Sequence, residues 1–184
     1  MGFKVNFDEA TSYDIKPEGE YECIITDIKE KQTKNGAMGL NFSLIIRNDV
    51  PGQKFGNSYL FYTIWKKREP TASDRAVNGY NFGQLMALGN AAAMTNGKEY
   101  DTLEDYLKDL LKHCIRVTLR HEEYNGKKQE RINEVSPTKF PDCRHVFKNA
   151  AANGDTYAKP ADQGFISATD CVYAEIIDDD GVPF

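Results

Sequence analysis

The feature that most constrains the fold is the order in which the spacing of apolar residues changes along the chain. Three segments in the first third alternate apolar and polar residues, as half-buried strands do. Two segments in the middle place apolar residues three and four positions apart, as helices do, and two further alternating segments follow. This order predicts a mainly β domain of five strands, with a helical insertion between the third strand and the fourth.

Turn signals bound the three N-terminal strands. We expect the first strand over residues 20–31, after Pro17, with the Asn35-Gly36 turn behind it. The second is expected over residues 40–48 and the third over residues 58–66. Alternation assigns to the inner face Tyr21, Cys23, Ile25, Leu40, Phe42, Leu44, Ile46, Leu60, Tyr62 and Ile64, and to the outer face Ile24, Ile28, Arg47, Tyr59, Phe61 and Trp65.

The middle of the chain carries the helical signals. Apolar spacing predicts helices over residues 80–94 and 102–111. The last two strands are expected over residues 113–123 and 129–135, joined at Asn125-Gly126, a typical hairpin turn. Three strands, a helical insertion and a hairpin are the order of a five-stranded Greek-key OB-fold barrel, although an SH3-like or other small barrel gives a similar order.

The charges divide the chain into two regions. Of the 28 acidic and 23 basic residues, residues 149–184 contain seven acidic and one basic, so residues 1–148 contain 21 and 22. We therefore interpret residues 1–148 as the folded domain. Residues 149–184 are predicted to be a linker and a largely disordered acidic C-terminal tail. A neutral domain can still bind phosphates where its basic residues cluster.

No sequence motif indicates an enzyme, a metal centre or a cofactor. The chain lacks a Walker A loop, a dinucleotide fingerprint, a His-Glu-x-x-His pair and a nucleophile elbow. Cys143-Arg144-His145 lacks a second ligand pair at zinc spacing, and the four cysteines are widely scattered. No stretch has the length of a membrane span or a signal peptide, so we expect a cytoplasmic protein that does not associate with membranes.

The last seven residues have the composition of a peptide ligand. An acidic run is followed by a short apolar stretch and an aromatic C-terminal residue. A basic rim on another protein would attract the carboxylates, and an apolar pocket would accept the ring. The residues expected to bind a partner are Asp178, Asp179, Asp180, Val182, Pro183 and Phe184.

This ending is similar to the acidic tip of bacterial single-stranded DNA-binding proteins, which recruits repair, recombination and replication enzymes. The layout of residues 15–184 also resembles phage-encoded single-stranded DNA-binding proteins. That second match lies in Pro17-Glu18-Gly19-Glu20-Tyr21, the Lys34-Asn35-Gly36 turn, the polar-aromatic third strand and the C-terminal ending. The resemblances imply a DNA-binding OB domain, recruitment through the tail, a dimer or tetramer, and, for a phage protein, a place in the host cytoplasm.

The binding of single strands without sequence specificity requires cations for phosphates and exposed aromatic faces for bases. The outer face of the third strand supplies Tyr59, Phe61 and Trp65 as candidate stacking residues. Packing of this face under the helical insertion is the alternative. The candidate phosphate-binding residues are Lys31, Lys34, Arg47, Lys66, Lys67, Arg68, Arg116, Arg120, Lys127, Lys128 and Arg131.

The sequence favours a single-stranded DNA-binding protein of phage replication and recombination. Two other functions stay open. A strand-annealing or recombination-mediator protein would bind the same ligand and also pair complementary strands. A protein-interaction adaptor would use the barrel and the tail without binding DNA.

Overall fold

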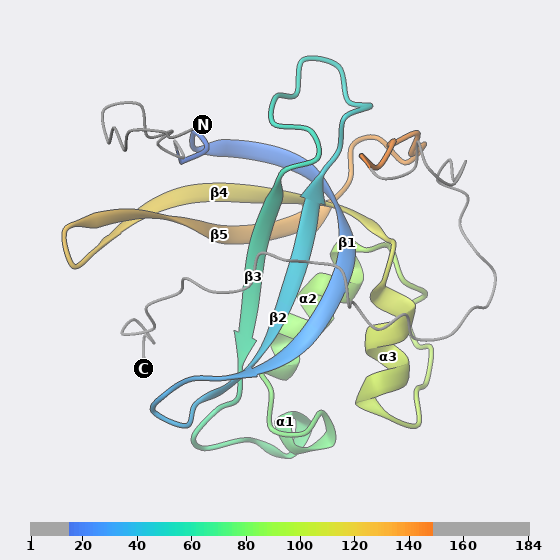
Figure 1. Ribbon diagram of the computed structural model, residues 1–184. Helices are drawn as coiled ribbons and strands as arrows, with labels where there is room; N and C mark the ends of the chain where they lie inside the picture. Colours follow the sequence, from blue (N-terminus) through green and yellow to red (C-terminus); the bar gives the residue numbers. More distant parts are fainter. Residues whose placement is uncertain (1–14, 149–184) are drawn as a thin grey trace, which may run out of the picture.

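Five antiparallel strands form one sheet in the part of the chain that the computed structural model describes, residues 15–148 (Figure 1). The expectations for the tail, including Asp178–Asp180 and Val182–Phe184, lie outside the described residues. The strands lie side by side in the order β3-β2-β1-β4-β5. Their bounds are β1 Gly19–Gln32, β2 Met38–Ile46, β3 Tyr59–Trp65, β4 Cys114–Tyr124 and β5 Lys127–Pro137.

β1 is the strand that joins the two halves of the sheet. Its first residues pair with β4 and its later residues pair with β2. The register with β2 shifts between Ile25 and Asp27, which is a β-bulge. Figure 1 shows β1 curving from the β4–β5 pair toward β2 and β3, which cross that pair at a steep angle.

The bulge corrects one prediction about β1. We expected Ile24 and Ile28 to share the outer face, because a regular strand alternates without interruption. One extra residue at the bulge moves Ile28 to the inner face, where it packs against the core. Ile24 is fully buried but lies outside the main core cluster, opposite Cys114 on β4 and Ile45 on β2.

The expected helical insertion is present between β3 and β4, with one more helix than the sequence predicted. Its helices are α1 Ala72–Ala76, α2 Phe82–Ala91 and α3 Leu103–Leu110. α1 begins with a capping box between Thr71 and Asp74. Five residues are too few to show helical periodicity, and for this reason the apolar pattern did not reveal α1.

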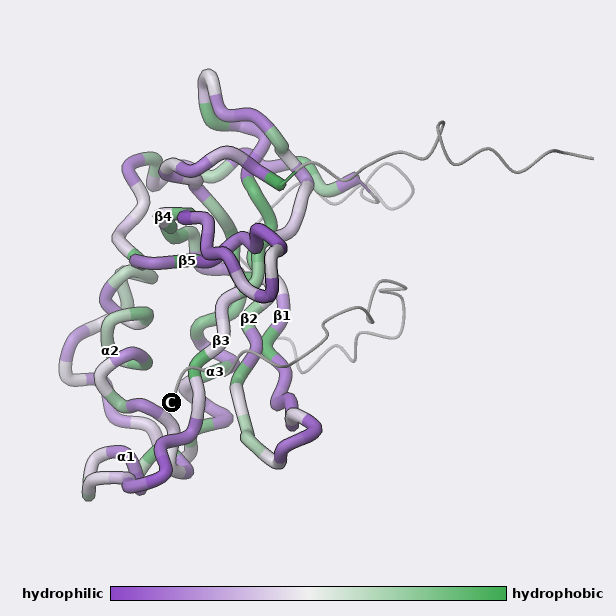
Figure 2. Tube along the Cα trace, turned by 90° about the vertical axis from the view of Figure 1, so that its left-hand side faces the viewer, coloured by the Kyte–Doolittle hydropathy of each residue, from purple (hydrophilic) through white to green (hydrophobic). Residues whose placement is uncertain are grey.

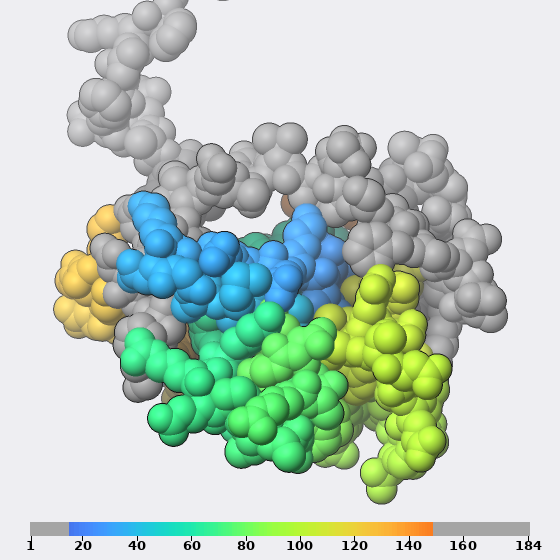
Figure 3. Space-filling view, turned by 90° about the horizontal axis from the view of Figure 1, so that it is seen from below, coloured from blue at the N-terminus to red at the C-terminus, as the bar shows by residue number. Residues whose placement is uncertain are grey.

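The helices cover the inner face of the sheet at one end. Leu85 and Leu88 of α2 belong to the same buried cluster as the inner residues of the strands. The hydroxyl of Tyr106 on α3 donates to the carbonyl of Leu85 at 2.5 Å, which ties α3 to α2. Figure 3 shows the helical segments, in green and yellow-green, forming a continuous surface beside the blue β1–β2 turn.

Residues 138–148, which we call the strap, follow β5 and lie against the outer face of β1 and β2. Glu22 accepts hydrogen bonds from Thr138 and from the N–H of Lys139, at 2.5 and 3.0 Å. The N–H of Asn48 donates to Nδ1 of the buried His145 at 3.1 Å. Ile24 and Ile45 lie on this part of the outer face, and both are buried.

Arg47 corrects a second prediction, because it is buried rather than exposed on the outer face. Its guanidinium donates to both carboxylate oxygens of Asp49, at 2.6 and 2.9 Å. It also donates to the carbonyls of Phe140 and Asp142 in the strap, at 2.6 and 2.9 Å. The alternation placed Arg47 on the correct face but could not show that the strap covers it. Arg47 therefore holds the strap and is withdrawn from the candidate phosphate ligands.

The structure contains no helix within residues 15–148 that is long and apolar enough to span a membrane. Figure 2 shows hydrophilic colouring along the β4–β5 hairpin and in the loops, with hydrophobic segments in the middle of the sheet.

Replacing Arg47 by lysine tests the role of the guanidinium in the strap. A single ammonium cannot reach the same four acceptors, so buried carbonyls lose their partners. We expect the Arg47→Lys substitution to lower the free energy of unfolding by about 2–4 kcal/mol, measured by urea denaturation. Arg116→Lys is the matched control, because Arg116 makes a partly exposed pair with Glu20, and it should cost less than about 1 kcal/mol. Equal losses in the two variants would contradict this role.

Candidate nucleic-acid interface

A row of aromatic side chains runs along the outer face of β3. Tyr59 is 41% exposed and Phe61 is 53% exposed, whereas Leu60 and Ile64 between and beyond them are buried. The rings of Tyr59 and Phe61 are nearly parallel, with an interplanar angle of 15° and centroids 6.5 Å apart. Trp65 continues the row and is half-buried. The alternative that helices cover this face is wrong for Tyr59 and Phe61.

The indole of Trp65 packs directly on β2 because Gly39, which lies opposite it, has no side chain. A Cβ atom built on Gly39 would lie 2.9 Å from the Trp65 ring and 2.8 Å from Cγ2 of Thr63. Both distances are too short for a real Cβ, so the indole lies over the glycine backbone. Glycine at this position gives the aromatic row a flat support at its far end.

The outer face of the first three strands is organised in rows across the sheet. Each row takes one residue from β1, one from β2 and one from β3. The pairing registers give the rows Lys31–Gly39–Trp65, Lys29–Asn41–Thr63, Asp27–Ser43–Phe61 and Ile24–Ile45–Tyr59. In the first two rows β1 contributes a lysine, the third row begins with the acidic Asp27, and β3 contributes an aromatic residue to every row except the one with Thr63.

The middle of these rows is polar, and it contains Asn41 and Ser43, which were not among the predicted site residues. Thr63 Oγ1 donates to Oδ1 of Asn41 at 3.1 Å, which fixes that amide on the outer face. The alternation of β2 contained the signal, because it placed Asn41 and Ser43 outward. These groups provide hydrogen-bonding capacity between the lysines and the rings.

Lys29 and Lys31 of β1 share the outer face with the aromatic row. Lys29 is exposed and pairs with Asp27 at 3.1 Å. Lys31 lies two strands away from Trp65, about 10 Å across the sheet at ordinary strand spacing. Within residues 15–148, neither Lys31 nor Lys34 forms an ion pair. These two lysines are available to a phosphate without breaking an existing pair.

The basic run after β3 is divided between structural and exposed positions. Lys66 pairs with Glu30 at 3.2 Å, and its ammonium lies 4.9 Å from the centroid of the Tyr80 ring. Lys67 pairs at 3.0 Å with the buried Asp74, which also caps α1. The backbone N–H of Phe82 is the first of several donors that lower the pKa of Asp74, so this pair stays charged. Arg68 is exposed beside them.

The arginines of β4 and β5 are paired with glutamates. Arg116 pairs with Glu20 at 3.2 Å and Arg120 with Glu18 at 3.5 Å. The pKa of Glu18 is lowered by the backbone N–H of His121, and the pKa of Glu20 is lowered mainly by the Lys139 ammonium. Arg131 forms a close ion pair with Glu122. These arginines belong to a mixed-charge region away from the aromatic row, and a phosphate would have to displace a carboxylate to bind them.

Lys127 and Lys128 begin β5 at the tip of the β4–β5 hairpin and are both exposed. Register places Lys128 opposite Glu123 and Lys127 opposite Tyr124. The hairpin projects away from the body of the molecule (Figure 1). It therefore lies apart from the cross-strand rows and could contact only a longer ligand.

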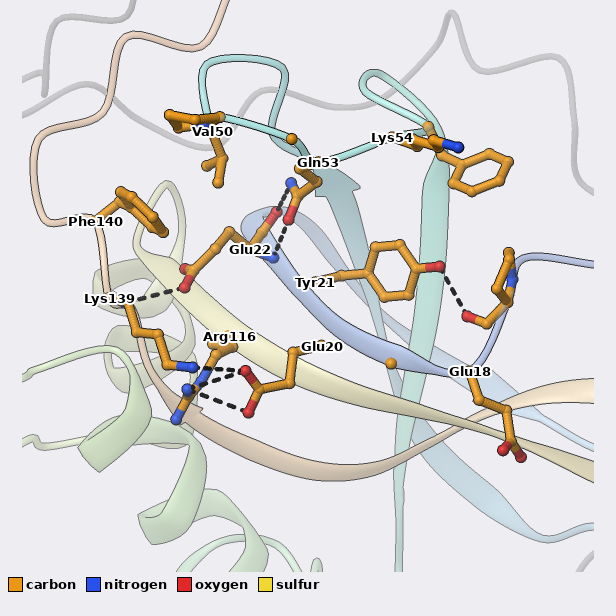
Figure 4. Close-up of a pocket in the computed structure, with 15 residues that line it drawn as sticks. Glu18, Glu20, Tyr21, Glu22, Val50, Gln53, Lys54, Arg116, Lys139 and Phe140 are labelled. Atoms are coloured by element: carbon orange, nitrogen blue, oxygen red, sulfur yellow. Dashed lines mark hydrogen bonds and ion pairs between the residues drawn. The ribbon is translucent and has the colours of Figure 1, made fainter.

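A shallow pocket of about 550 Å³ lies where the start of β1 meets the β2–β3 loop (Figure 4). Phe140 and Val50 give it apolar walls. Its carboxylates are already engaged, because Glu20 bonds Lys139 at 2.7 Å and Glu22 bonds the strap. The pocket thus offers little unpaired charge to a ligand.

The structure brings no cluster of three or more His, Cys, Asp or Glu side chains into metal-binding geometry within residues 15–148. Cys23 is fully buried in the core, whereas Cys114 and Cys143 are half-buried. His145 is buried in the strap contact, and its Nδ1 is already occupied by Asn48. The Cys143-Arg144-His145 segment acts in strap packing.

The chain belongs to a family described as a protein of unknown function (DUF669), whose sequence profile matches residues 3–152. This range contains all of residues 15–148 and ends before the acidic C-terminal residues. A search of the curated proteins gave no match. The family description carries no activity, so the surface chemistry of the sheet is the basis for a function.

Adding a methyl group at Gly39 tests the support of Trp65. In the Gly39→Ala variant the new Cβ displaces the indole, so the tryptophan emission should shift to longer wavelength and acrylamide should quench it more strongly. We also expect a loss of about 1–3 kcal/mol in unfolding free energy from the overpacking.

Gly83→Ala is the matched control for this substitution. Its Cβ would lie no closer than 3.5 Å to Asn81, an ordinary contact, and Gly83 is on α2, away from the indole. This variant should leave the emission of Trp65 unchanged. Unchanged emission in Gly39→Ala as well would contradict the packing of Trp65 over Gly39.

Proposed function

We propose that this protein binds single-stranded DNA without sequence specificity on the outer face of β1, β2 and β3. The observation that carries the proposal is the exposed, nearly parallel pair Tyr59 and Phe61 with Trp65 farther along the same strand. Exposed rings on a sheet stack on the faces of any bases, and each stack is worth about 1–3 kcal/mol. A chain does not gain stability by leaving two large rings in water, which favours a ligand for them.

The cross-strand rows suggest how a strand would lie. Bases stack on the rings of β3, while the sugar-phosphate backbone follows β1, where Lys29 and Lys31 face outward. Lys34 in the β1–β2 turn and Arg68 after β3 would extend the positive path at that end. Asn41 and Thr63 lie between the two paths and can hydrogen-bond to bases or sugars without selecting a sequence.

The ion pairs of this surface determine how strongly salt should weaken DNA binding. Because Lys31 and Lys34 are the lysines of this surface that form no ion pair with any residue in 15–148, few counterions are released, and stacking supplies much of the affinity. Salt should weaken binding with a modest slope of about −0.7 per phosphate contact. A domain with almost no net charge is compatible with binding that depends more on stacking than on phosphate contacts.

We also assign the sheet to a five-stranded Greek-key OB barrel. The order β3-β2-β1-β4-β5, the curved and bulged β1, and the helical insertion between β3 and β4 support this assignment. β3 and β5, the two edges of the sheet, approach one another, as they would in such a barrel. The proposed DNA surface is then the strand face that OB folds use for nucleic acids.

Residues 149–184 extend the proposal to partner proteins. Asp178–Asp180 with Val182, Pro183 and Phe184 would recruit replication and recombination enzymes, as the resemblance to bacterial single-stranded DNA-binding proteins implies. We propose a binding role without catalysis, in a cytoplasmic protein of a phage-infected cell that assembles as a dimer or tetramer. Strand annealing and a DNA-independent adaptor role are the other functions, and each gives a different result below.

Titration of the full chain with oligo-dT, followed by Trp65 fluorescence and by a mobility shift at two salt concentrations, tests DNA binding. We expect quenching of Trp65, because a base stacks on or near the indole. Tyr59→Ala and Phe61→Ala should each lower the affinity about 5- to 100-fold.

Met86→Ala is the control for this titration, because Met86 is 39% exposed but lies on α2, on the other side of the sheet. Its affinity should equal that of the unsubstituted chain. Absence of binding at low salt would overturn the proposal and leave the adaptor role. Accelerated pairing of complementary strands would favour the annealing role.

A chain that ends at Ile177 separates recruitment from DNA binding. Calorimetric titration with purified replication and recombination enzymes should show binding by the full chain and none by the shortened chain, because the terminal ring and carboxylates are lost. DNA affinity should persist in both. Equal binding of every enzyme by the two chains would contradict recruitment by this ending.

A further inference from the structure

His145 is buried where the end of the strap meets the segment that follows β2. The side chain is 1% exposed, and its ring meets the ring of Phe147 edge to face, with centroids 4.6 Å apart. The backbone N–H of Asn48 donates to Nδ1 of His145 at 3.1 Å. The side chain of Asn48 donates to the carbonyl of Val146 at 2.7 Å and accepts from the Val146 N–H at 3.0 Å. These hydrogen bonds join Asn48 to two successive residues of the strap.

The hydrogen bond from Asn48 fixes the protonation state of the His145 ring. A backbone N–H can only donate, so Nδ1 must be unprotonated, and the proton of the neutral ring lies on Nε2. Nε2 is buried and has no hydrogen-bond partner within residues 15–148. A second proton, on Nδ1, would place an N–H against the Asn48 N–H and leave a buried imidazolium with no acceptor in this part of the chain. The observed packing is therefore compatible only with the neutral ring.

The other two of the three histidines respond differently to a proton. Nδ1 of His113 lies 2.7 Å from the carbonyl oxygen of Ala92, and Nε2 of His121 lies 2.7 Å from the carbonyl oxygen of Lys16. Because a carbonyl only accepts, each of these nitrogens carries a proton in the bonded form. A second proton on the opposite ring nitrogen leaves both bonds in place. Protonation breaks an existing hydrogen bond of the ring at His145 alone.

The charges around His145 do not stabilise a protonated ring. Asp49 favours the charged form and the Arg47 guanidinium opposes it, but burial has the largest effect and lowers the pKa of His145. Both carboxylate oxygens of Asp49 already accept hydrogen bonds from Arg47. The charged and titratable side chains of residues 142–148 and of the segment that they contact are Arg47, Asp49, Asp142, Cys143, Arg144 and Lys148.

We propose that His145 is a pH-sensitive latch: uptake of one proton from solvent at Nδ1 breaks the hydrogen bond to Asn48 and releases the end of the strap, residues 145–148, from the segment after β2. Arg47 and Asp49 continue to hold residues 140–144, so the release is local. Residues 149–184 follow directly in the chain, so the latch controls how firmly they are joined to the domain. This latch does not depend on the proposed binding of DNA.

The direction of the pH response follows from the two states of the ring. A histidine in water has a pKa of about 6.5, and the pKa of the buried His145 is lower, so the released strap binds a proton more readily than the latched one. The latch is therefore at full strength above pH about 6.5 and weakens as the pH falls toward the pKa of the buried ring. Within that window each pH unit raises the released fraction by up to about tenfold.

Nuclear magnetic resonance of the full, ¹⁵N-labelled chain tests the latch. At neutral pH the ring signals of His145 should show the proton on Nε2 and none on Nδ1. Hydrogen exchange of the Asn48 amide is then followed from pH 8 to pH 5 and corrected for the intrinsic exchange rate. Its protection should fall by up to about tenfold per pH unit below pH about 6.5, whereas that of Leu44, in the middle of β2, should stay constant.

Two substitutions separate His145 from other groups that titrate. In His145→Asn an amide oxygen can replace Nδ1 as the acceptor and cannot titrate, so the Asn48 amide should stay protected at pH 5. His121→Gln is the matched control, because its amide can still donate to the Lys16 carbonyl, and the pH response of Asn48 should persist.

Three results would overturn the latch. The first is a neutral His145 ring with its proton on Nδ1. The second is protection of the Asn48 amide that falls no more than that of Leu44 as the pH is lowered. The third is a His145→Asn variant with an unchanged pH response. The first two are measured on the unsubstituted chain, so they decide the question even if the variant does not fold.

Discussion

The buried ion pair between Arg47 and Asp49 is the interaction on which one end of the molecule depends. The other donors of the Arg47 guanidinium bind the carbonyls of Phe140 and Asp142. These hydrogen bonds keep the strap on the outer face. Burial alone would raise the pKa of Asp49, but hydrogen bonds from Arg47 and from the Arg144 N–H outweigh this effect and lower it. A buried guanidinium that lost these acceptors would be an uncompensated charge, so the pair and the strap must form together.

The outer face has two regions of different character. On β1 and β2 this face carries Ile24 and Ile45, which are buried outside the main core cluster. On β3 the same face carries Tyr59 and Phe61, which remain in water. One face of the sheet thus combines buried aliphatic residues on β1 and β2 with exposed rings on β3. The helices cover the inner face at one end of the sheet.

The sequence predicted those features that depend on local periodicity. The five strands and inner residues such as Leu44 and Ile64 follow from alternation, and the insertion follows from helical spacing; all are confirmed. Alternation also oriented Tyr59 and Phe61 outward. Alternation could not predict the burial of Arg47, because that burial depends on the strap, a segment ninety-odd positions away. It also could not predict the ion pair of Arg120 with Glu18, which depends on the register of β1 and β4. The bulge before Asp27 and the short α1 left no periodic signal.

The position of the strap has a consequence for the rest of the chain. Residues 138–148 end against Asn48, so the described part of the chain ends on the face that also carries the aromatic row. Under the function proposed above, an enzyme bound by the last residues would be tethered on that face. It would then meet DNA on β3 at a local concentration set by the length of the tether rather than by the concentration in solution.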